Sequence, residues 1–251
     1  MLAIDLTGKK AFVTGGSRGI GKSICLTLAQ AGADVAFTYL SNENAAKSVE
    51  KQIQEMGRKA IAYQADAADY SRMKEVLNDI EKQFSVLDII VNNAGGSPRI
   101  DFHDLTPEQL DDSLKRNLYG PFYSIMAGID LMEKAGGGSI INIGSSAMYS
   151  GFGGGPHYSA AKSGLMGLTR YLAVDLGPKQ IRANTLAVSL IKTELLENSQ
   201  KEVLDEKIKT VPLGRLGLPE DVAYMTAFLA SDMGSYISGE MILMDGARTY
   251  A

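Results

Sequence analysis

Short apolar runs alternate along the chain with longer stretches in which apolar residues recur every three or four positions. The short runs predict buried strands, and the longer stretches predict amphipathic helices. The predicted strands are 9–15, 34–39, 59–64, 87–92, 138–144, 181–187 and 240–245. The predicted helices are 20–31, 44–56, 71–84, 107–132 with a bend at Gly120-Pro121, 156–177, 193–210 and 219–231.

Regular alternation of strands and helices predicts a mostly parallel sheet with both faces covered. We therefore expect an α/β fold, a Rossmann-like doubly wound sheet of about seven parallel strands with helices on both faces. The repeated unit is a strand followed by a helix, and no linker-like segment separates one group of units from another. Residues 1–251 are accordingly expected to form a single domain.

The first predicted strand leads directly into a glycine-rich stretch, residues 15–21, and then into a helix. Glycines allow a tight turn and a close approach of a pyrophosphate to the backbone, and a helix N-terminus offers free N–H groups to the anion. A plain turn that happens to be rich in glycine is the alternative. The position of the stretch between a strand and a helix favours a dinucleotide site.

Polar residues follow several of the predicted strands. They are Ser17-Arg18, Asp66, Asn92-Asn93, Ser145-Ser146 and Thr193. Because ligands bind beyond the carboxyl ends of the strands in such sheets, these side chains should meet at one edge. Packing alone does not explain this distribution.

Tyr158 and Lys162 lie four residues apart in a predicted helix, which places both side chains on one face. A neighbouring ammonium favours the phenolate and should lower the pKa of the phenol. The pair could then exchange a proton near pH 7. The alternative is a half-buried aromatic residue beside a solvated lysine, and the spacing by itself does not exclude it.

Composition narrows the class of protein. Hydrophobic residues make up 45% of the 251 residues, charged residues 22%, and the net charge is −4. This balance disfavours a nucleic-acid or anionic-membrane surface, and no apolar run is long enough to span a membrane. Cys25 has no partner for an internal disulfide, and His103 and His157 suggest no metal site. We expect a cytoplasmic enzyme or binding protein without a metal.

Taken together, the motifs resemble the short-chain dehydrogenase/reductase family. The residues that carry the resemblance are Thr14-Gly15-x-x-x-Gly19-x-Gly21, Asn92-Asn93-Ala94-Gly95, Asn117, Ser145 and Tyr158-x-x-x-Lys162. Ser145 precedes Tyr158 by 13 residues, which matches the pattern that is common in this family and favours Ser145 over Ser146. The resemblance covers nearly the whole chain and is greatest to bacterial 3-oxoacyl-(acyl-carrier-protein) reductases.

The resemblance implies a role for each of four residues. Tyr158 would donate a proton to a carbonyl oxygen, and Lys162 would lower the pKa of Tyr158 and bind the nicotinamide ribose. Ser145 would hold and polarise the substrate oxygen. Asn117 would anchor a water that links Lys162 to solvent. The cofactor would carry the hydride, and the protein would position and polarise the reactants.

The cofactor is expected to be NADP(H), with NAD(H) as the alternative. Tyr39 stands where an NAD-specific relative carries a carboxylate, and Arg18 could pair with a 2′-phosphate. Asp66 would accept a hydrogen bond from the adenine amino group. The expected cofactor-binding residues are Gly15, Ser17, Arg18, Gly19, Ile20, Gly21, Tyr39, Ser41, Asp66, Ala67, Asn93, Ala94, Gly95, Tyr158, Lys162, Ile191 and Thr193.

The sequence departs from the family pattern at Val188-Ser189, where relatives usually carry Pro-Gly in the loop under the nicotinamide. The replacement removes a fixed φ and a permissive glycine, so we expect a loop of different shape or greater mobility. Thr193 keeps the position that contacts the carboxamide, although a shifted loop would alter its geometry.

Substrate recognition is expected from residues 96–104, 148–157 and 190–210, the last of which resembles the family's mobile lid. Ser145 would contact the substrate, and Met148, Phe152 and Leu190 would form an apolar wall. The expected reaction is NADPH-dependent reduction of a ketone, either a 3-oxoacyl thioester or another small-molecule carbonyl.

Other functions stay open at this point. Another small alcohol, a sugar or a steroid could be the substrate. Residues 131–134 and 169–174 resemble an enoyl-reductase branch, but that branch spaces its tyrosine and lysine more widely. A non-catalytic nucleotide-binding protein is a further alternative. Residues 156–177 and 237–245 resemble the family's oligomer contacts, which predicts a homotetramer.

Overall fold

The computed structural model describes residues 3–151, 153–194 and 201–251. Seven parallel strands form one sheet in the order β3-β2-β1-β4-β5-β6-β7. Their bounds are Lys10–Val13 for β1, Asp34–Tyr39 for β2, Ala60–Gln64 for β3, Ile89–Asn92 for β4, Gly138–Ser145 for β5, Ile181–Val188 for β6 and Met241–Met244 for β7. The strand order reverses between β1 and β4, which is where such sheets bind ligands.

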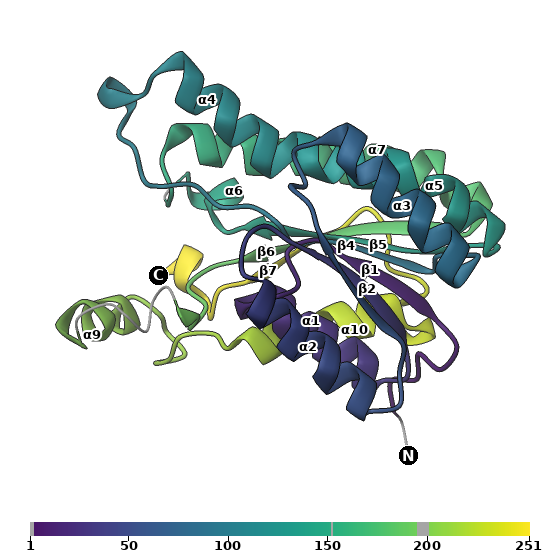
Figure 1. Ribbon diagram of the computed structural model, residues 1–251. Helices are drawn as coiled ribbons and strands as arrows, with labels where there is room; N and C mark the ends of the chain where they lie inside the picture. The colour runs from purple at the N-terminus through teal and green to yellow at the C-terminus, as the bar shows by residue number, and fades with distance from the viewer. Residues whose placement is uncertain (1–2, 152, 195–200) are drawn as a thin grey trace.

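Helices cover both faces of the sheet (Figure 1). One face carries α1 (Gly19–Gln30), α2 (Glu43–Glu55) and α10 (Pro219–Ala230). The other carries α3 (Tyr70–Phe84), α4 (Pro107–Leu114), α5 (Gly120–Lys134) and α7 (Pro156–Asp175). The short α6 (Ala147–Ser150) follows β5, and α9 (Lys201–Lys209) extends away from the sheet near the C-terminus. The predicted α/β fold is confirmed.

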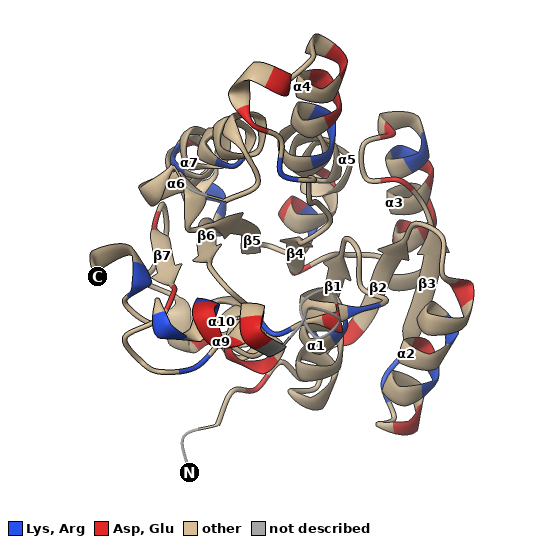
Figure 2. Cartoon of the chain, turned by 90° about the vertical axis from the view of Figure 1, so that its left-hand side faces the viewer, with Lys and Arg blue, Asp and Glu red and all other residues tan. Residues whose placement is uncertain are grey.

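Each face of the sheet packs into its own hydrophobic core. Along β1, Phe12 belongs to the core beneath α3, α5 and α7, whereas its neighbour Val13 belongs to the core beneath α1, α2 and α10. This separation follows from the alternation of side chains along a strand. In Figure 2 the charged residues lie mainly on the outer helices and loops, and the strands are mostly uncoloured. Both faces of the sheet are therefore apolar, and polar groups concentrate at the edge where the strands end.

The long helix predicted over 107–132 contains an irregular turn directly before Gly120-Pro121, where a bend was expected. It is a π turn at Lys115–Tyr119, and α5 begins at Gly120. The Gly120 N–H donates to the Lys115 carbonyl, five residues back. Pro121 has no N–H to offer the Asn117 carbonyl at the usual four-residue distance, which favours a wider turn at this point.

The described part of the predicted helix over 193–210 is helical. Glu194 is helical, α9 covers Lys201–Lys209, and Thr193 lies just before the helical residues, outside any regular element. Residues 195–200 lie outside the described residues, as does Phe152 of the expected apolar wall. Across the described ranges, no helix is long and apolar enough to cross a membrane.

Val188-Ser189 continues the sheet. Val188 is the last residue of β6 and pairs with Ser145 on one side and Met244 on the other. The Ser189 N–H then donates to the Met244 carbonyl at 3.1 Å. The backbone of both residues is therefore tied to neighbouring strands.

Candidate active site

The glycine turn after β1 is held by hydrogen bonds from two other strands. The Thr38 hydroxyl accepts from the Gly15 N–H at 3.1 Å, and the Thr38 carbonyl accepts from the Gly16 N–H at 2.8 Å. The Asn93 side-chain amide donates to the Thr14 and Gly15 carbonyls, both at 3.0 Å. Thr38 was not among the expected site residues. The only feature of the sequence that could have indicated it is a hydroxyl group one position before the end of a buried strand.

The start of α1 fits a bound phosphate group. Arg18 caps the helix without a side-chain hydrogen bond, and the first turn holds no acidic residue. Its free N–H groups and positive dipole end remain available to an anion. A Cβ added at Gly21 would lie 2.1 Å from the Gly15 carbonyl oxygen. Only glycine therefore lets the turn and the helix approach this closely, as the predicted pyrophosphate site requires.

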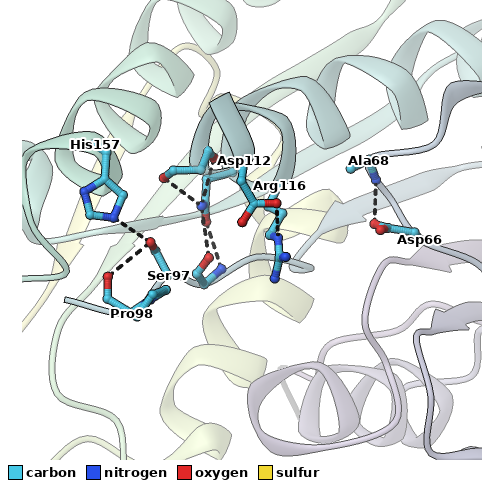
Figure 3. Close-up of polar contacts among 10 residues, drawn as sticks. Asp66, Ala68, Ser97, Pro98, Asp112, Arg116 and His157 are labelled. Atoms are coloured by element: carbon cyan, nitrogen blue, oxygen red, sulfur yellow. Dashed lines mark hydrogen bonds and ion pairs between the residues drawn. The ribbon is translucent and has the colours of Figure 1, made fainter. Parts of the chain in front are cut away.

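Several expected cofactor residues lie around this turn. Tyr39 ends β2 and is buried, whereas Arg18 and Ser41 are exposed. The Asp66 carboxylate accepts from the Ala68 N–H at 2.9 Å, which fixes the bend after β3 (Figure 3). The Thr193 methyl lies 3.4 Å from the position that a Cβ on Gly19 would take. The remaining expected cofactor residues lie on four segments of the same edge. Ser17 and Ile20 lie in the glycine turn and the start of α1, and Ala67 lies in the bend after β3. Ala94 and Gly95 follow β4, and Ile191 forms a bridge to Gly217.

Ser145, Tyr158 and Lys162 come together beyond the end of β5. The Ser145 hydroxyl lies beside the Tyr158 phenol and acts on the pKa of that phenol. Lys162 is buried, donates to the Ile143 carbonyl at 2.8 Å, and has its Nζ 5.9 Å from the centre of the Tyr158 ring. Ser146 forms a backbone bond with the sheet instead, its N–H donating to the Val188 carbonyl at 2.8 Å. The 13-residue spacing thus selected the serine that contacts the phenol.

Burial controls the acid–base properties of this group. It raises the pKa of Tyr158 above the ordinary value of a phenol, and the hydrogen bond with Ser145 opposes that rise only in part. Burial also lowers the pKa of Lys162 to about 8. The expectation that Lys162 lowers the pKa of Tyr158 is therefore wrong for the protein alone. Desolvation dominates the pKa of the phenol, and the hydrogen bond of the Lys162 ammonium goes to a backbone carbonyl.

Asn117 lies in the π turn and is completely buried. Its Oδ1 accepts from the Gly96 N–H at 2.9 Å, and its Nδ2 donates to the carbonyls of Gly96 (3.1 Å) and Ser113 (3.0 Å). A Cβ added at Gly95 would meet Asn117 Oδ1 at 2.8 Å and Lys162 Nζ at 3.3 Å. Asn117 thus faces Lys162 across Gly95, with its side-chain amide committed to the backbone.

The expected substrate wall is only partly assembled. Met148 packs on the sheet, because a Cβ at Gly144 would meet its sulfur at 2.8 Å. Leu190 lines a cavity of about 620 Å³ together with residues of α10 and of the chain after β7, and none of the four predicted catalytic residues lines it. Gly154 has φ +71°, and a Cβ there would meet the Tyr158 ring at 2.6 Å. The glycine-rich loop therefore lies directly against Tyr158.

The fold agrees with comparisons to known proteins. A family model described as enoyl-(acyl carrier protein) reductase matches residues 15–248. The 3-oxoacyl-(acyl-carrier-protein) reductase FabG of Staphylococcus aureus is 35% identical over 95% of this chain and 97% of its own. Acetoacetyl-CoA reductase of Rhizobium meliloti is 39% identical over 96% of this chain and 98% of its own. The chain belongs to the short-chain dehydrogenase/reductase family.

The relatives are oxidoreductases that differ in what they act on. An L-rhamnose 1-dehydrogenase (NAD(P)(+)) of a Sphingomonas species is 35% identical over 96% of each chain. A short-chain dehydrogenase/reductase from Serratia marcescens superposes with a TM-score of 0.92, at 37% identity over 97% of this chain and 99% of the other. This protein is accordingly an oxidoreductase of a family that uses NAD(P) cofactors.

Proposed function

We propose that the protein is an NADPH-dependent reductase that converts a ketone to an alcohol. The observation that carries this proposal is the placement of the Ser145 hydroxyl and the buried Lys162 ammonium beside the Tyr158 phenol, at the carboxyl edge of the sheet. A hydroxyl pair of this kind can hold one carbonyl oxygen from two sides. The same edge carries the glycine turn, so a dinucleotide and a carbonyl would meet there.

Each side chain has a separate task in the proposed reaction. Ser145 and Tyr158 orient the carbonyl oxygen, and the raised pKa of Tyr158 keeps its proton in place at neutral pH until that oxygen becomes basic. The bound cofactor supplies the hydride. Lys162 then stabilises the phenolate that forms, since its ammonium is the nearby cation. Because the side chain of Asn117 is already bonded, its backbone carbonyl is the group left to anchor a water that returns the proton.

The preference for NADPH rests on charge at the end of β2. No carboxylate stands at Tyr39 or Ser41 to repel a 2′-phosphate, and the exposed Arg18 lies in the glycine turn. We expect kcat/KM to be higher with NADPH than with NADH. Arg18→Ala should reduce the NADPH value about tenfold or more and leave NADH almost unchanged, because a charge-assisted hydrogen bond contributes about 1.5–3 kcal/mol. Lys22→Ala, one turn further along α1, is the matched control. Equal wild-type values, or a preference for NADH, would contradict the assignment.

The proposed substrate class is a 3-oxoacyl thioester or a similar small ketone, on the similarity to the two thioester reductases. A sugar, a steroid or another small alcohol remains an alternative, and the description of the matching family model keeps enoyl reduction as a second candidate. The test is NADPH absorbance with a panel of 3-oxoacyl thioesters, enoyl thioesters, sugars, steroids and quinones. If NADPH is oxidised only in the presence of enoyl thioesters, the protein is an enoyl reductase and the proposed ketone reduction is wrong. No oxidation by any of them would favour a nucleotide-binding protein without turnover.

We also propose a homotetramer. Tyr171 and Val174 on α7 are 67% and 80% exposed, and Tyr236 before β7 is fully exposed. Tyr171 and Val174 lie in the first of the two segments that resemble the family's oligomer contacts, and Tyr236 directly precedes the second. Light scattering at micromolar concentration should give four times the chain mass; a monomer would refute the proposal.

A further inference from the structure

A second contact at the start of α7 lies next to Tyr158. His157 is 1% exposed, and its Nε2 lies 2.7 Å from the Ser97 hydroxyl oxygen (Figure 3). The two residues are 60 positions apart in the sequence. Figure 3 shows the imidazole pointing from α7 toward the chain that follows β4. Neither residue has a role in the proton transfer proposed above.

The imidazole of His157 has one hydrogen-bond partner among the described residues. Its Nε2 pairs with the Ser97 hydroxyl, and the tautomer of the imidazole sets which of the two atoms donates. The same hydroxyl lies 3.2 Å from the Pro98 carbonyl, to which it donates when Nε2 carries the hydrogen. His157 Nδ1 is buried and has no hydrogen-bond partner among the residues that the structure describes. An imidazole buried with one unpaired nitrogen costs free energy, so the bond to Ser97 is what orients it.

Ser97 belongs to residues 96–104, a segment expected to border the substrate site, which we call the substrate-side loop. Its first residue, Gly96, is fixed by Asn117. Further along, the Ile100 carbonyl oxygen would lie 2.3 Å from a Cβ on Gly155, and Gly155 has φ +92°. The loop thus lies against the glycines that precede Tyr158, and the bond to His157 lies between these two anchoring points.

We propose that His157 and Ser97 form a clamp that positions the substrate-side loop against Tyr158. Asn117 secures the end of the loop that faces the cofactor, and His157 secures the part that faces the carbonyl substrate. His157 is in this sense a positioning residue that sets the width of the site beside Tyr158. The proposal rests on the proposed carbonyl reduction and adds a residue that determines substrate affinity.

The first test separates substrate binding from the chemical step. His157→Leu and Ser97→Ala should each raise KM for the best carbonyl about fivefold or more, with kcat and the Kd for NADPH within twofold of wild type. His157→Gln keeps a side-chain N–H and should restore most of the affinity. The double variant Ser97→Ala/His157→Leu should be no worse than either single variant, because both remove one bond. Ser48→Ala, which removes a hydrogen-bonded hydroxyl on α2, is the control and should match wild type.

The second test does not need turnover. Hydrogen–deuterium exchange of the 96–104 amides in the NADPH-bound protein should be faster in His157→Leu and Ser97→Ala, and close to wild type in His157→Gln. Unchanged exchange in His157→Leu would overturn the clamp, as would an unchanged KM or an equal loss of affinity for NADPH. A wild-type protein that reduces no carbonyl would instead overturn the proposed function, and the exchange result would still decide whether the clamp exists.

Discussion

On the cofactor side of the candidate site, the side chains of Thr38 and Asn93 bind the backbone of the glycine turn, and the Thr14 hydroxyl accepts from the Asn93 N–H. On the substrate side, the chain runs through exposed loops in which Gly153, Gly154 and Gly155 all have positive φ. The first region is fixed by elements of the sheet, and the second by few side-chain contacts. Such a division lets a family keep one cofactor geometry while the substrate loops vary, as the different named substrates of the relatives illustrate.

The largest effect is expected at Tyr158, which lies between the cofactor side and the substrate side of the candidate site. Tyr158→Phe removes the proposed proton donor and keeps the ring, so kcat for carbonyl reduction should fall about 10³-fold, within the usual range for general acid catalysis. NADPH binding, measured by fluorescence titration, should stay within twofold. Tyr171→Phe, at an exposed position of the same helix, should behave as wild type. A loss of less than tenfold in kcat would remove Tyr158 from the proposed role.

The next effect concerns Lys162, at the same junction. The pKa of Lys162 is about 8 in the folded protein, compared with an ordinary value of 10.5 that applies to the unfolded chain. Between these two pH values the unfolded chain therefore binds more protons than the folded protein. Stability should therefore rise with pH in that window, by about 3 kcal/mol for a shift of this size. Urea unfolding of the cofactor-free protein should show the wild type gaining this much relative to Lys162→Met between pH 8 and 10.5. A difference that does not change with pH would contradict the effect of burial.

A change on the cofactor side alone should have an intermediate effect. In Gly21→Ala the new Cβ would lie 2.1 Å from the Gly15 carbonyl oxygen, so the glycine turn must shift. The Kd for NADPH should rise at least tenfold. Gly167→Ala, on the exposed side of α7 with no atom within 4 Å, is the matched control and should slightly stabilise the helix. If both variants bind NADPH like wild type, the turn is not the phosphate site.

The smallest effect is expected on the substrate side. A Cβ at Gly153 would meet no atom within 4 Å, and the only cost is its φ of +106°. A loop held by few contacts can relax, so Gly153→Ala should change KM for the carbonyl about threefold and leave the Kd for NADPH unchanged. An effect on NADPH as large as that of Gly21→Ala would show that the two sides are not independent.

Periodic apolar patterns predicted the strands and most of the helices, because those elements bury one or both faces in the two cores. The proline at position 121 predicted an irregularity at Gly120-Pro121, but not its form, because apolar periodicity does not distinguish a π turn from a bend. Spacing predicted Ser145, Tyr158 and Lys162 as site residues, and the structure places them close together.

Other features of the candidate site could not be predicted from the sequence. The pKa of Tyr158 depends on burial, which spacing does not report, and its direction was predicted wrongly. The bond between His157 and Ser97 joins segments 60 residues apart through a loop with no regular pattern. Thr38 resembles an ordinary strand residue in the sequence, although its hydroxyl accepts from the glycine turn.

Because of the π turn at Lys115–Tyr119, the geometry of the site depends on the number of residues between α4 and α5. Loss of one residue there would let α4 and α5 join as a continuous α-helix, and α4 would rotate by about 100° relative to α5. The side chain at position 117 would then no longer face Gly96, whatever residue it was. Between Ser113 and Pro121 we therefore expect single-residue deletions to be tolerated far less well than most substitutions at exposed positions.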